Sequence, residues 1–447
     1  MLIDSDGQRV TLQLLIISPD WQDYGTWIKW QNSLTLGILV HFRHFRQLFQ
    51  QSWQNQLTLP PRSTGSFRVR TKGRSSLKRV FVRDWSQIQR GDRLGPWFPV
   101  LAFFSFFYGS GVRSRLWAYK WRLFKRERLP GFVLSIGNLT VGGTGKTPAV
   151  MMLAKWARDE GRRVAILSRG FGGRYREELL EVSDGTHVKA DPRSAGDEPY
   201  LLAAKLSGVP VIISRKRMLA GSFARKKFGC DFFILDDGFQ HLELERDLDL
   251  VLIDASNPFG NGHLLPWGPL REPVSQLDRA DAFILTRVGD DGPGSRAGKF
   301  LKERFPQTPV SCARHLPDKV VFPVSNKTHD PGFLKGKRVL AFCGIARPAM
   351  FKETISKLGV DIAYFKAFKD HYRFKWDDMR NLMELKGKYN AQILLTTEKD
   401  WVRLAVSGCE HPDISYLSIK FVLVSKKDRI FEMIKDSVVA FEKGKAI

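Results

Sequence analysis

Cysteine is scarce in this sequence, with four residues in a chain of 447. The four lie far apart, and no two of them have the C-x-x-C spacing of a zinc ribbon or a redox motif. The chain therefore lacks the cysteines of a disulfide-stabilised secreted scaffold. We expect it to fold in a reducing compartment.

Acidic residues are also under-represented. The chain carries 71 Lys and Arg against 46 Asp and Glu, for a formal net charge of +25, and residues 1–95 contain no glutamate. A second basic segment, residues 113–128, holds seven Lys and Arg against Glu127 alone. Such an excess predicts an anionic partner: nucleic acid, a membrane surface or a phosphorylated substrate.

No stretch of the sequence reaches the ~18 uncharged apolar residues of a clear transmembrane helix. The nearest is WFPVLAFFSFFYGSGV at 97–112, and a basic, Trp-bearing segment follows it at once. This pattern predicts an amphipathic helix over 96–128 that lies in the membrane interface or enters it shallowly. A buried core helix with a solvated basic face is the alternative. A signal peptide fits poorly, because the apolar run lies far from Met1 and precedes the basic cluster.

Residues 1–95 differ from the rest of the chain. They are rich in Gln, Arg and Trp, and no methionine occurs between Met1 and Met151. We interpret them as a basic extension, which is either a poorly ordered arm or an over-extended start of the gene.

Regular alternation of apolar runs and helix-like segments begins near Leu129 and predicts an α/β fold with a doubly wound, mostly parallel sheet over 129–325. A turn-rich stretch at 318–337 leads to a second, smaller α/β lobe over 326–447. The expected core strands are 132–136, 164–167, 209–213, 231–235, 250–253 and 282–286, and those of the second lobe are 339–343, 393–396 and 421–424. Helices are clearest at 147–159 and 348–358.

A glycine-rich turn follows the first of these strands. In this strand–turn–helix context it predicts a phosphate-cradling loop, so the fold is expected to be of the P-loop nucleotide-binding type. Lys146 would carry its charge to the outer phosphates, and Thr147 would offer its hydroxyl to Mg²⁺. An ordinary glycine-rich turn is the alternative, since Thr140 stands where the usual pattern has a glycine. The predicted phosphate-binding residues are Thr140, Val141, Gly142, Gly143, Thr144, Gly145, Lys146 and Thr147.

A second polar cluster, DDGFQH at 236–241, directly follows the predicted strand 231–235. An aspartate at the carboxyl end of a strand can hold Mg²⁺ directly or through water. Asp236 and Asp237 point different ways from an extended strand, so one can face the metal while the other braces the loop. The alternative is a simple Asp-Gly turn.

Two further motifs carry charged side chains. In GDEP at 196–199, Asp197 is either the N-cap of an ordinary helix or a carboxylate fixed in place as a general base. The proline-rich loop NGHLLPWGPLREP at 261–273 supplies Arg271, which can pair bidentately with phosphate or carboxylate.

The second lobe has two motifs of its own. FKDHY places His371 beside Asp370, whose carboxylate could orient and charge the imidazole. TTEKD at 396–400 predicts a helix start with threonine caps. Both also have purely structural interpretations.

The motifs GNLTVGGTGKTP, SRGFGG, GDEP, DDGFQH, NGHLLPWGPLREP, AFCGIARP, KDHY and TTEKD, in this order, resemble those of tetraacyldisaccharide 4'-kinase, the lipid A 4'-kinase of Gram-negative bacteria. The resemblance runs from about Trp97 to near the C terminus and leaves out residues 1–95. It implies a P-loop kinase with a smaller C-terminal lobe, working at the cytoplasmic face of the inner membrane as a peripheral or monotopic protein. It further implies transfer of the γ-phosphate of ATP to the 4'-hydroxyl of a tetraacylated disaccharide 1-phosphate.

The resemblance also assigns roles to residues. Asp197 resembles the catalytic base, His371 the histidine paired with it, and Lys146 the phosphate-binding lysine. The implied cofactors are ATP and Mg²⁺, and the implied partners are the lipid disaccharide and a membrane surface, with a monomer and no nucleic acid expected. The Mg²⁺ residues are Thr147, Glu198, Asp236 and Asp237, and other site residues are Gln240, His241 and Arg271.

Two rival functions remain at this stage. One is a membrane-associated P-loop ATPase or GTPase switch. A guanine-selective N-K-x-D motif after a strand would favour the GTPase, but TTEKD resembles that motif only loosely. The other is a non-enzymatic protein that binds membranes or nucleic acid through its basic arm. This function would assign no role to the motifs DDGFQH and GDEP.

Overall fold

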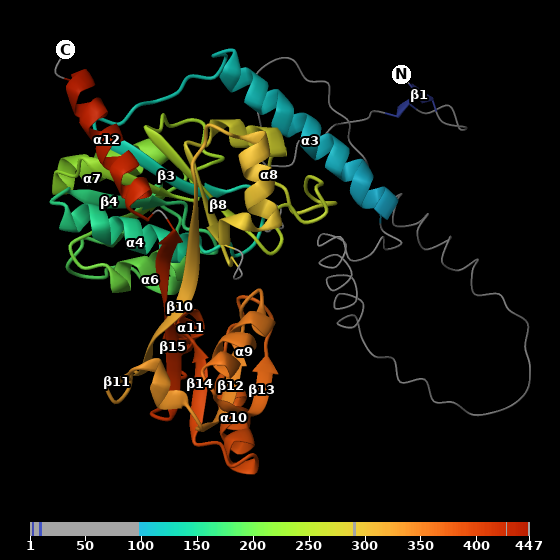
Figure 1. The fold of residues 1–447 in the computed structure, drawn as a ribbon, viewed down its shortest axis with the longest axis vertical. Helices are drawn as coiled ribbons and strands as arrows, with labels where there is room; N and C mark the ends of the chain where they lie inside the picture. Colours follow the sequence, from blue (N-terminus) through green and yellow to red (C-terminus); the bar gives the residue numbers. More distant parts are fainter. Residues whose placement is uncertain (1, 4–8, 11–97, 289–291, 426, 446–447) are drawn as a thin grey trace, which may run out of the picture. The chain divides into compact units, whose positions relative to one another are not determined.

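The computed structural model describes residues 2–3, 9–10, 98–288, 292–425 and 427–445 (Figure 1). The chain divides into two compact units, residues 1–114 with 264–268, and residues 115–263 with 269–447. Most of residues 1–95, interpreted from the sequence as a basic extension, lies outside the described residues. Its described part is an antiparallel pair of β1 (Leu2–Ile3) and β2 (Arg9–Val10).

Helix α3 (Phe98–Lys120) carries the apolar run identified in the sequence. In the first unit its buried positions, Leu101, Ser105 and Gly109, recur every four residues and so share one face. Ser105 Oγ donates a 2.8 Å hydrogen bond to the carbonyl oxygen of Leu264. The exposed aromatic side chains of this part are Phe103, Phe104, Phe106 and Phe107. No helix among the described residues has the length and apolar content needed to cross a membrane.

The helix is shorter than the predicted 96–128. It ends at Lys120 because Arg122 takes a left-handed φ of 57°, which an α-helix does not accommodate. Beyond this turn the chain is extended: Glu127 forms a parallel bridge with Leu244, and its N–H donates to the Glu243 carbonyl oxygen at 2.8 Å.

The second unit is built on one large, mostly parallel sheet of 13 strands within the described residues, in the order β13-β12-β14-β15-β10-β9-β8-β3-β7-β4-β6-β5, with β11 paired to β10. The antiparallel pairs are β5–β6, β10–β15 and β10–β11. The strands are β3 (Phe132–Asn138), β4 (Val164–Ser168), β5 (Leu179–Ser183), β6 (Val211–Ser214), β7 (Phe232–Asp236), β8 (Leu248–Asp254), β9 (Ala282–Thr286), β10 (Val310–Phe322), β11 (Lys327–His329), β12 (Arg338–Cys343), β13 (Asp361–Ala367), β14 (Ile393–Thr397) and β15 (Ile414–Ser425). The predicted α/β class is confirmed.

Helices cover both faces of this sheet. Phe132, Leu134 and Ile136 of β3 enter one apolar cluster with α4, α6 and α12, whereas Val133 enters another with α7. Adjacent residues of a strand point to opposite faces, so a strand buried on both sides reads as a continuous apolar run. The helices are α4 (Lys146–Asp159), α5 (Pro192–Ala195), α6 (Asp197–Lys205), α7 (Arg217–Phe228), α8 (Arg296–Arg304), α9 (Pro348–Lys357), α10 (Trp376–Lys388), α11 (Glu398–Val406) and α12 (Lys427–Lys445).

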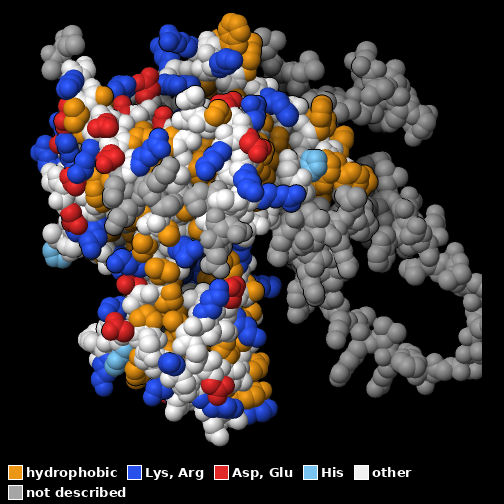
Figure 2. Space-filling model, viewed as in Figure 1, with side chains coloured by type: hydrophobic (Ala, Val, Ile, Leu, Met, Phe, Trp, Pro, Cys, Tyr) orange, Lys and Arg blue, Asp and Glu red, His pale blue; other side chains and the backbone are white. Residues whose placement is uncertain are grey.

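The smaller lobe predicted over 326–447 lies in the same compact unit as most of the predicted core and shares its sheet. Strands β10 and β15 pair antiparallel along most of their length and continue the sheet from β9 to β14 (Figure 1). The prediction that residues 318–337 are turn-rich with few clear elements is therefore partly wrong, because β10 extends to Phe322 and β11 follows it. Figure 2 shows Lys and Arg side chains spread over the face in view, consistent with the net charge of +25.

Candidate active site

The phosphate loop lies between β3 and α4, as the sequence predicts. Gly145 precedes α4 with a φ of 95°, and Gly142 has a φ of 113°, conformations that residues with a Cβ rarely adopt. A Cβ at Gly142 or Gly143 would meet nothing within 4 Å, so the loop is open at these two positions. The N-terminus of α4 opens onto this loop, which favours an anion there.

Neighbouring segments hold the loop by its carbonyl oxygens. Thr286 Oγ1 donates to the Thr144 carbonyl at 2.9 Å, and Arg287 donates to the carbonyl of Gly143. Arg287 also pairs with Asp254 at the end of β8, at 2.5 Å. Arg347, from the second lobe, reaches the same Asp254 carboxylate at 2.6 Å. Sequence reasoning assigned no role to these three charged residues.

Lys146 faces the carboxylates at the end of β7. Its Nζ donates to Asn138 Oδ1 at 3.0 Å and lies 3.4 Å from Asp237 Oδ1. Arg271 donates to the other oxygen of Asp237 at 2.6 Å. Burial alone would raise the pKa of Asp237, but Arg271 and Lys146 hold it well below its usual range. The residue also has a left-handed φ of 56°, a strained conformation of the kind that gathers at functional sites.

Asp236 has a different environment. Ser168 Oγ donates to its Oδ2 at 2.9 Å, while its buried Oδ1 has no hydrogen-bond partner among the described residues. Burial, and then the charges of Glu198 and Asp237, raise the pKa of Asp236 to about 6. An ionised carboxylate here would be stabilised by a cation.

Glu198 is the third carboxylate of this group. Lys399 of α11 donates to Glu198 Oε1 at 2.5 Å, and its charge is the main cause that lowers the Glu198 pKa to about 2. Among the described residues no three His, Cys, Asp or Glu side chains form a metal cluster by themselves. The orphaned oxygen of Asp236 nevertheless fits Mg²⁺, which takes one or two carboxylates and completes its shell with phosphates and water. Thr147, the second residue of α4, is buried beside the loop.

Asp197 and His371 meet, although 174 residues separate them. His371 Nδ1 lies 3.2 Å from Asp197 Oδ2, and Arg403 Nε donates to the same oxygen at 2.7 Å. Arg403 also donates to Asp400 Oδ1 at 2.8 Å and to the Gly344 carbonyl at 2.7 Å. Burial opposes ionisation of Asp197, but His371 and Arg403 lower its pKa to about 2.

Two features of this group differ from simple sequence expectations. Gly196, not Asp197, is the N-cap of α6, so the Asp197 side chain is free to face the second lobe. Arg403 lies three residues beyond TTEKD and was missed, although its spacing from Asp400 matches one helical turn. TTEKD itself is a helix start, as predicted: the Thr397 hydroxyl accepts from the Asp400 N–H at 3.2 Å.

Gln240 and His241 follow the paired aspartates. Gln240 Nε2 donates to the Asn138 carbonyl at 2.9 Å, and Arg115 donates to the Gln240 carbonyl at 3.0 Å. Burial, followed by four nearby arginines, lowers the pKa of His241 to about 3, so its imidazole is neutral.

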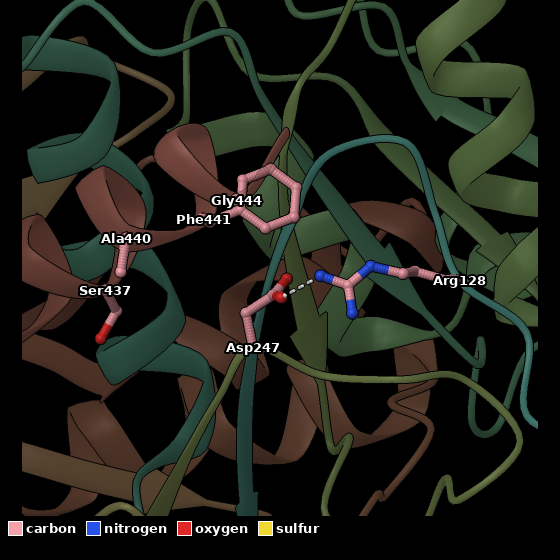
Figure 3. A pocket seen from close by; sticks show the side chains of 6 residues that line it. All are labelled: Arg128, Asp247, Ser437, Ala440, Phe441 and Gly444. Carbon is pink, nitrogen blue, oxygen red and sulfur yellow. Dashed lines mark hydrogen bonds and ion pairs between the residues drawn. The ribbon is translucent and has the colours of Figure 1, made fainter. Parts of the chain in front are cut away.

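One pocket lies away from these residues. Its volume is about 490 Å³, and it is lined by Arg128, Asp247, Ser437, Ala440, Phe441 and Gly444 (Figure 3). Arg128 and Asp247, paired at 3.0 Å, precede β3 and β8, so the pocket marks the amino end of these strands. The candidate site is at their carboxyl end.

The fold and these residues define an α/β kinase built around a phosphate-binding loop. A family model described as tetraacyldisaccharide-1-P 4'-kinase matches residues 97–438. The chain therefore belongs to the tetraacyldisaccharide 4'-kinase family, whose phosphotransferase activity serves lipid A biosynthesis.

Individual relatives agree with this assignment. The tetraacyldisaccharide 4'-kinase of Syntrophus aciditrophicus is 38% identical over 358 residues, covering 78% of this chain and 96% of the relative. That of Pelobacter propionicus is 41% identical over 302 residues, covering 67% and 81%. A solved structure of LpxK from Aquifex aeolicus in complex with ATP is 32% identical, covers 75% of this chain and 97% of its own, and has a TM-score of 0.59.

Proposed function

We propose that this chain uses ATP and Mg²⁺ to phosphorylate the 4'-hydroxyl of a tetraacyldisaccharide 1-phosphate, with Asp197 and His371 acting on that hydroxyl. The observation that carries the proposal is the 3.2 Å contact between these two side chains. Phosphoryl transfer needs positioned reactants, charge neutralisation and a group that accepts the hydroxyl proton. A carboxylate that contacts an imidazole is a suitable acceptor.

The remaining residues supply the other two requirements. Lys146 and the N–H groups of Thr140 and of residues 142–147 bind the phosphates of ATP, whereas the Val141 N–H donates to the Pro269 carbonyl oxygen at 2.8 Å. Asp236, Asp237, Glu198 and Thr147 would hold Mg²⁺. When bound, Mg²⁺ neutralises charge on the phosphate oxygens. Glu198 links the two groups, because it is next to Asp197 in the chain and lies within the electrostatic range of both Lys146 and Asp237.

The acceptor is a lipid, and α3 has the surface to meet it. Exposed Phe103, Phe106 and Trp117 stand on the same helix as Arg113 and Lys120. Aromatic side chains favour the membrane interface, and basic ones favour anionic headgroups. We propose that the protein works as a peripheral enzyme at the cytoplasmic face of the inner membrane.

A transfer assay tests this function. The protein is incubated with [γ-³²P]ATP, Mg²⁺ and tetraacyldisaccharide 1-phosphate in mixed micelles, and the lipid product is isolated and its phosphate positions are assigned by NMR. Label at the 4' position supports the proposal. Release of labelled inorganic phosphate without a labelled lipid would indicate an ATPase instead.

A further inference from the structure

Arg287 holds the phosphate loop from a neighbouring strand end. It directly follows β9, and its guanidinium donates to the carbonyl oxygen of Gly143. This carbonyl and the N–H of Thr144 belong to one peptide group. Because a trans peptide is planar, its C=O and N–H point in opposite directions. A donor that fixes the Gly143 carbonyl therefore also fixes the direction of the Thr144 N–H.

The loop needs such a restraint, because it has little rigidity of its own at this point. Gly142 and Gly143 have no Cβ, so their backbone can adopt many conformations. A Cβ at either position would meet nothing within 4 Å, so side-chain packing does not restrain them. The hydrogen bond from Arg287 is charge-assisted and thus about twice as strong as a neutral one.

Asp254 at the end of β8 fixes Arg287 in turn. Its Oδ2 accepts from Arg287 Nη1 at 2.5 Å and lies 2.6 Å from Arg347 Nη1, while its Oδ1 accepts from the Ser256 hydroxyl at 2.6 Å. Burial alone would raise the pKa of Asp254, but Arg287, Ser256 and Arg347 hold it below its usual range. The carboxylate is therefore ionised at neutral pH, and both of its oxygens have partners.

The backbone of Arg287 is strained. Its φ of 55° is left-handed, as are those of Asp237 and His371 in the candidate site. For residues with a Cβ this conformation costs free energy, and it persists where the surroundings enforce it, often at functional sites. The strain indicates that the position of Arg287 matters to the loop that it contacts.

We propose that Arg287 is a positioning residue for ATP: oriented by Asp254, it directs the Thr144 N–H toward the phosphates. Arg347 of the smaller lobe holds the same carboxylate, so this lobe contributes to the affinity for ATP without contacting the nucleotide there. The inference deepens the proposed function and rests on it, because it takes the loop to bind ATP.

The test measures the affinity for ATP with Mg²⁺ by calorimetry, without the lipid acceptor. The variants are Arg287→Gln, Arg287→Lys, Asp254→Asn, Arg347→Gln and, as a matched control, Arg338→Gln. Arg338 is also an arginine of the smaller lobe that pairs with an aspartate, Asp361 at 2.9 Å, but it begins β12, whereas Arg347 follows that strand. Thermal melting shows which variants fold.

Arg287→Gln should weaken ATP binding about 10- to 100-fold, because the charged hydrogen bond to the Gly143 carbonyl is lost. Arg287→Lys keeps the charge but not the planar fork, so it should restore only part of the affinity. Unchanged affinity in Arg287→Gln, or full affinity in Arg287→Lys, would overturn the proposal.

Asp254→Asn separates positioning from direct attraction between Arg287 and ATP. Removing a negative charge near an anionic ligand would tighten binding through electrostatics alone, whereas loss of the orientation of Arg287 weakens it. We expect weaker binding. Tighter binding would mean that Arg287 attracts ATP by its charge, and would overturn the positioning role.

Arg347→Gln should weaken ATP binding about 2- to 5-fold, the effect of a partly exposed ion pair, and should have no further effect in the Asp254→Asn background. Since the Arg347 side chain is 41% exposed, this variant carries the test if Asp254 or Arg287 tolerates no change. Unchanged affinity, or a loss that persists without the Asp254 charge, would contradict the proposal. The KM for the acceptor and the affinity of Arg338→Gln for ATP should stay at wild-type values. A wild type that binds no ATP would contradict the proposed function itself.

Discussion

Arg403 Nε donates a 2.7 Å hydrogen bond to Oδ2 of Asp197, and so joins α11 of the smaller lobe to the first residue of α6 in the core. His371 contacts the same carboxylate oxygen. Two further ion pairs run between these helices, Lys399 with Glu198 at 2.5 Å and Lys205 with Glu398 at 2.5 Å. The contacts around the proposed base therefore come from both lobes.

Replacing Arg403 with Gln should change the pH dependence of turnover. Without the Arg403 charge, one of the effects that lower the pKa of Asp197 is lost, while burial still raises it. The pKa of Asp197 therefore rises from about 2, and the acid limb of the kcat profile moves to higher pH. The ion pair contributes stability above the unfolded aspartate pKa of about 3.9, and this contribution is lost as pH falls toward 2. Arg403→Lys, which keeps the charge, should shift the limb less. Superimposable profiles for the three proteins would show that Arg403 does not tune Asp197.

Asp236→Asn should stabilise the free protein while abolishing activity. Because burial raises the folded pKa of Asp236 to about 6, its ionisation opposes folding increasingly as pH rises from about 3.9 to 6. Removing the charge should add about 1–3 kcal/mol at pH 7.5, or several degrees in Tm, and less at pH 5. Scanning calorimetry without Mg²⁺ or ATP measures this. A lower Tm for the variant at pH 7.5 would mean that Asp236 is already neutralised by its surroundings.

Lys146→Ala should lower kcat by about 100-fold or more, because it removes charge stabilisation from the transferred phosphoryl group. The lysine also lies beside Asn138 and Asp237, so the matched control is Lys155→Ala, an exposed lysine on the same helix α4. Initial rates at saturating ATP are compared. Near-normal turnover with Lys146→Ala would refute the phosphate-loop assignment.

The core of the fold could be predicted from sequence because its strands are buried on both faces. Each reads as a short, nearly continuous apolar run, as 132–136 does apart from Ser135 and 282–286 does up to Thr286. Strand β5 (Leu179–Ser183) and strand β13 (Asp361–Ala367) lie at the two edges of the sheet, have mixed burial and were missed. Strand β10 was missed because its polar residues pair with β15, a partner about 100 positions later in the chain.

The candidate site also has residues whose position could be predicted from the sequence and residues whose position could not. Lys146, Asp236 and Asp237 stand next to strands that the sequence reveals, so their place at one edge of the sheet could be predicted. The contact of Arg403 with Asp197 could not, since it depends on how α11 packs near α6. The end of the predicted membrane helix depends on the backbone of Arg122, and no feature of that residue type marks a left-handed turn.

Basic residues of α3 and the following turn should bind anionic membranes. Each Lys or Arg near the surface contributes about 1 kcal/mol, so replacing Arg113, Lys120, Arg122 and Lys125 with Gln should weaken liposome binding about 10- to 1000-fold at low salt. Arg115 is left intact because it holds the Gln240 carbonyl. Sedimentation with anionic and with zwitterionic vesicles measures the effect. Equal partitioning of variant and wild type onto anionic vesicles would mean that another surface binds the membrane.

The most direct test of the account is a double-mutant cycle at Asp197 and His371. If the two act as one unit on the acceptor hydroxyl, Asp197→Ala and His371→Ala should each lower kcat strongly and leave the affinity for ATP nearly unchanged. The double variant should then be little worse than the worse single variant, because residues that act as a unit are non-additive. Initial rates at saturating ATP and lipid acceptor are measured for all four proteins. Fully multiplicative losses, or a mild effect of Asp197→Ala alone, would contradict the account.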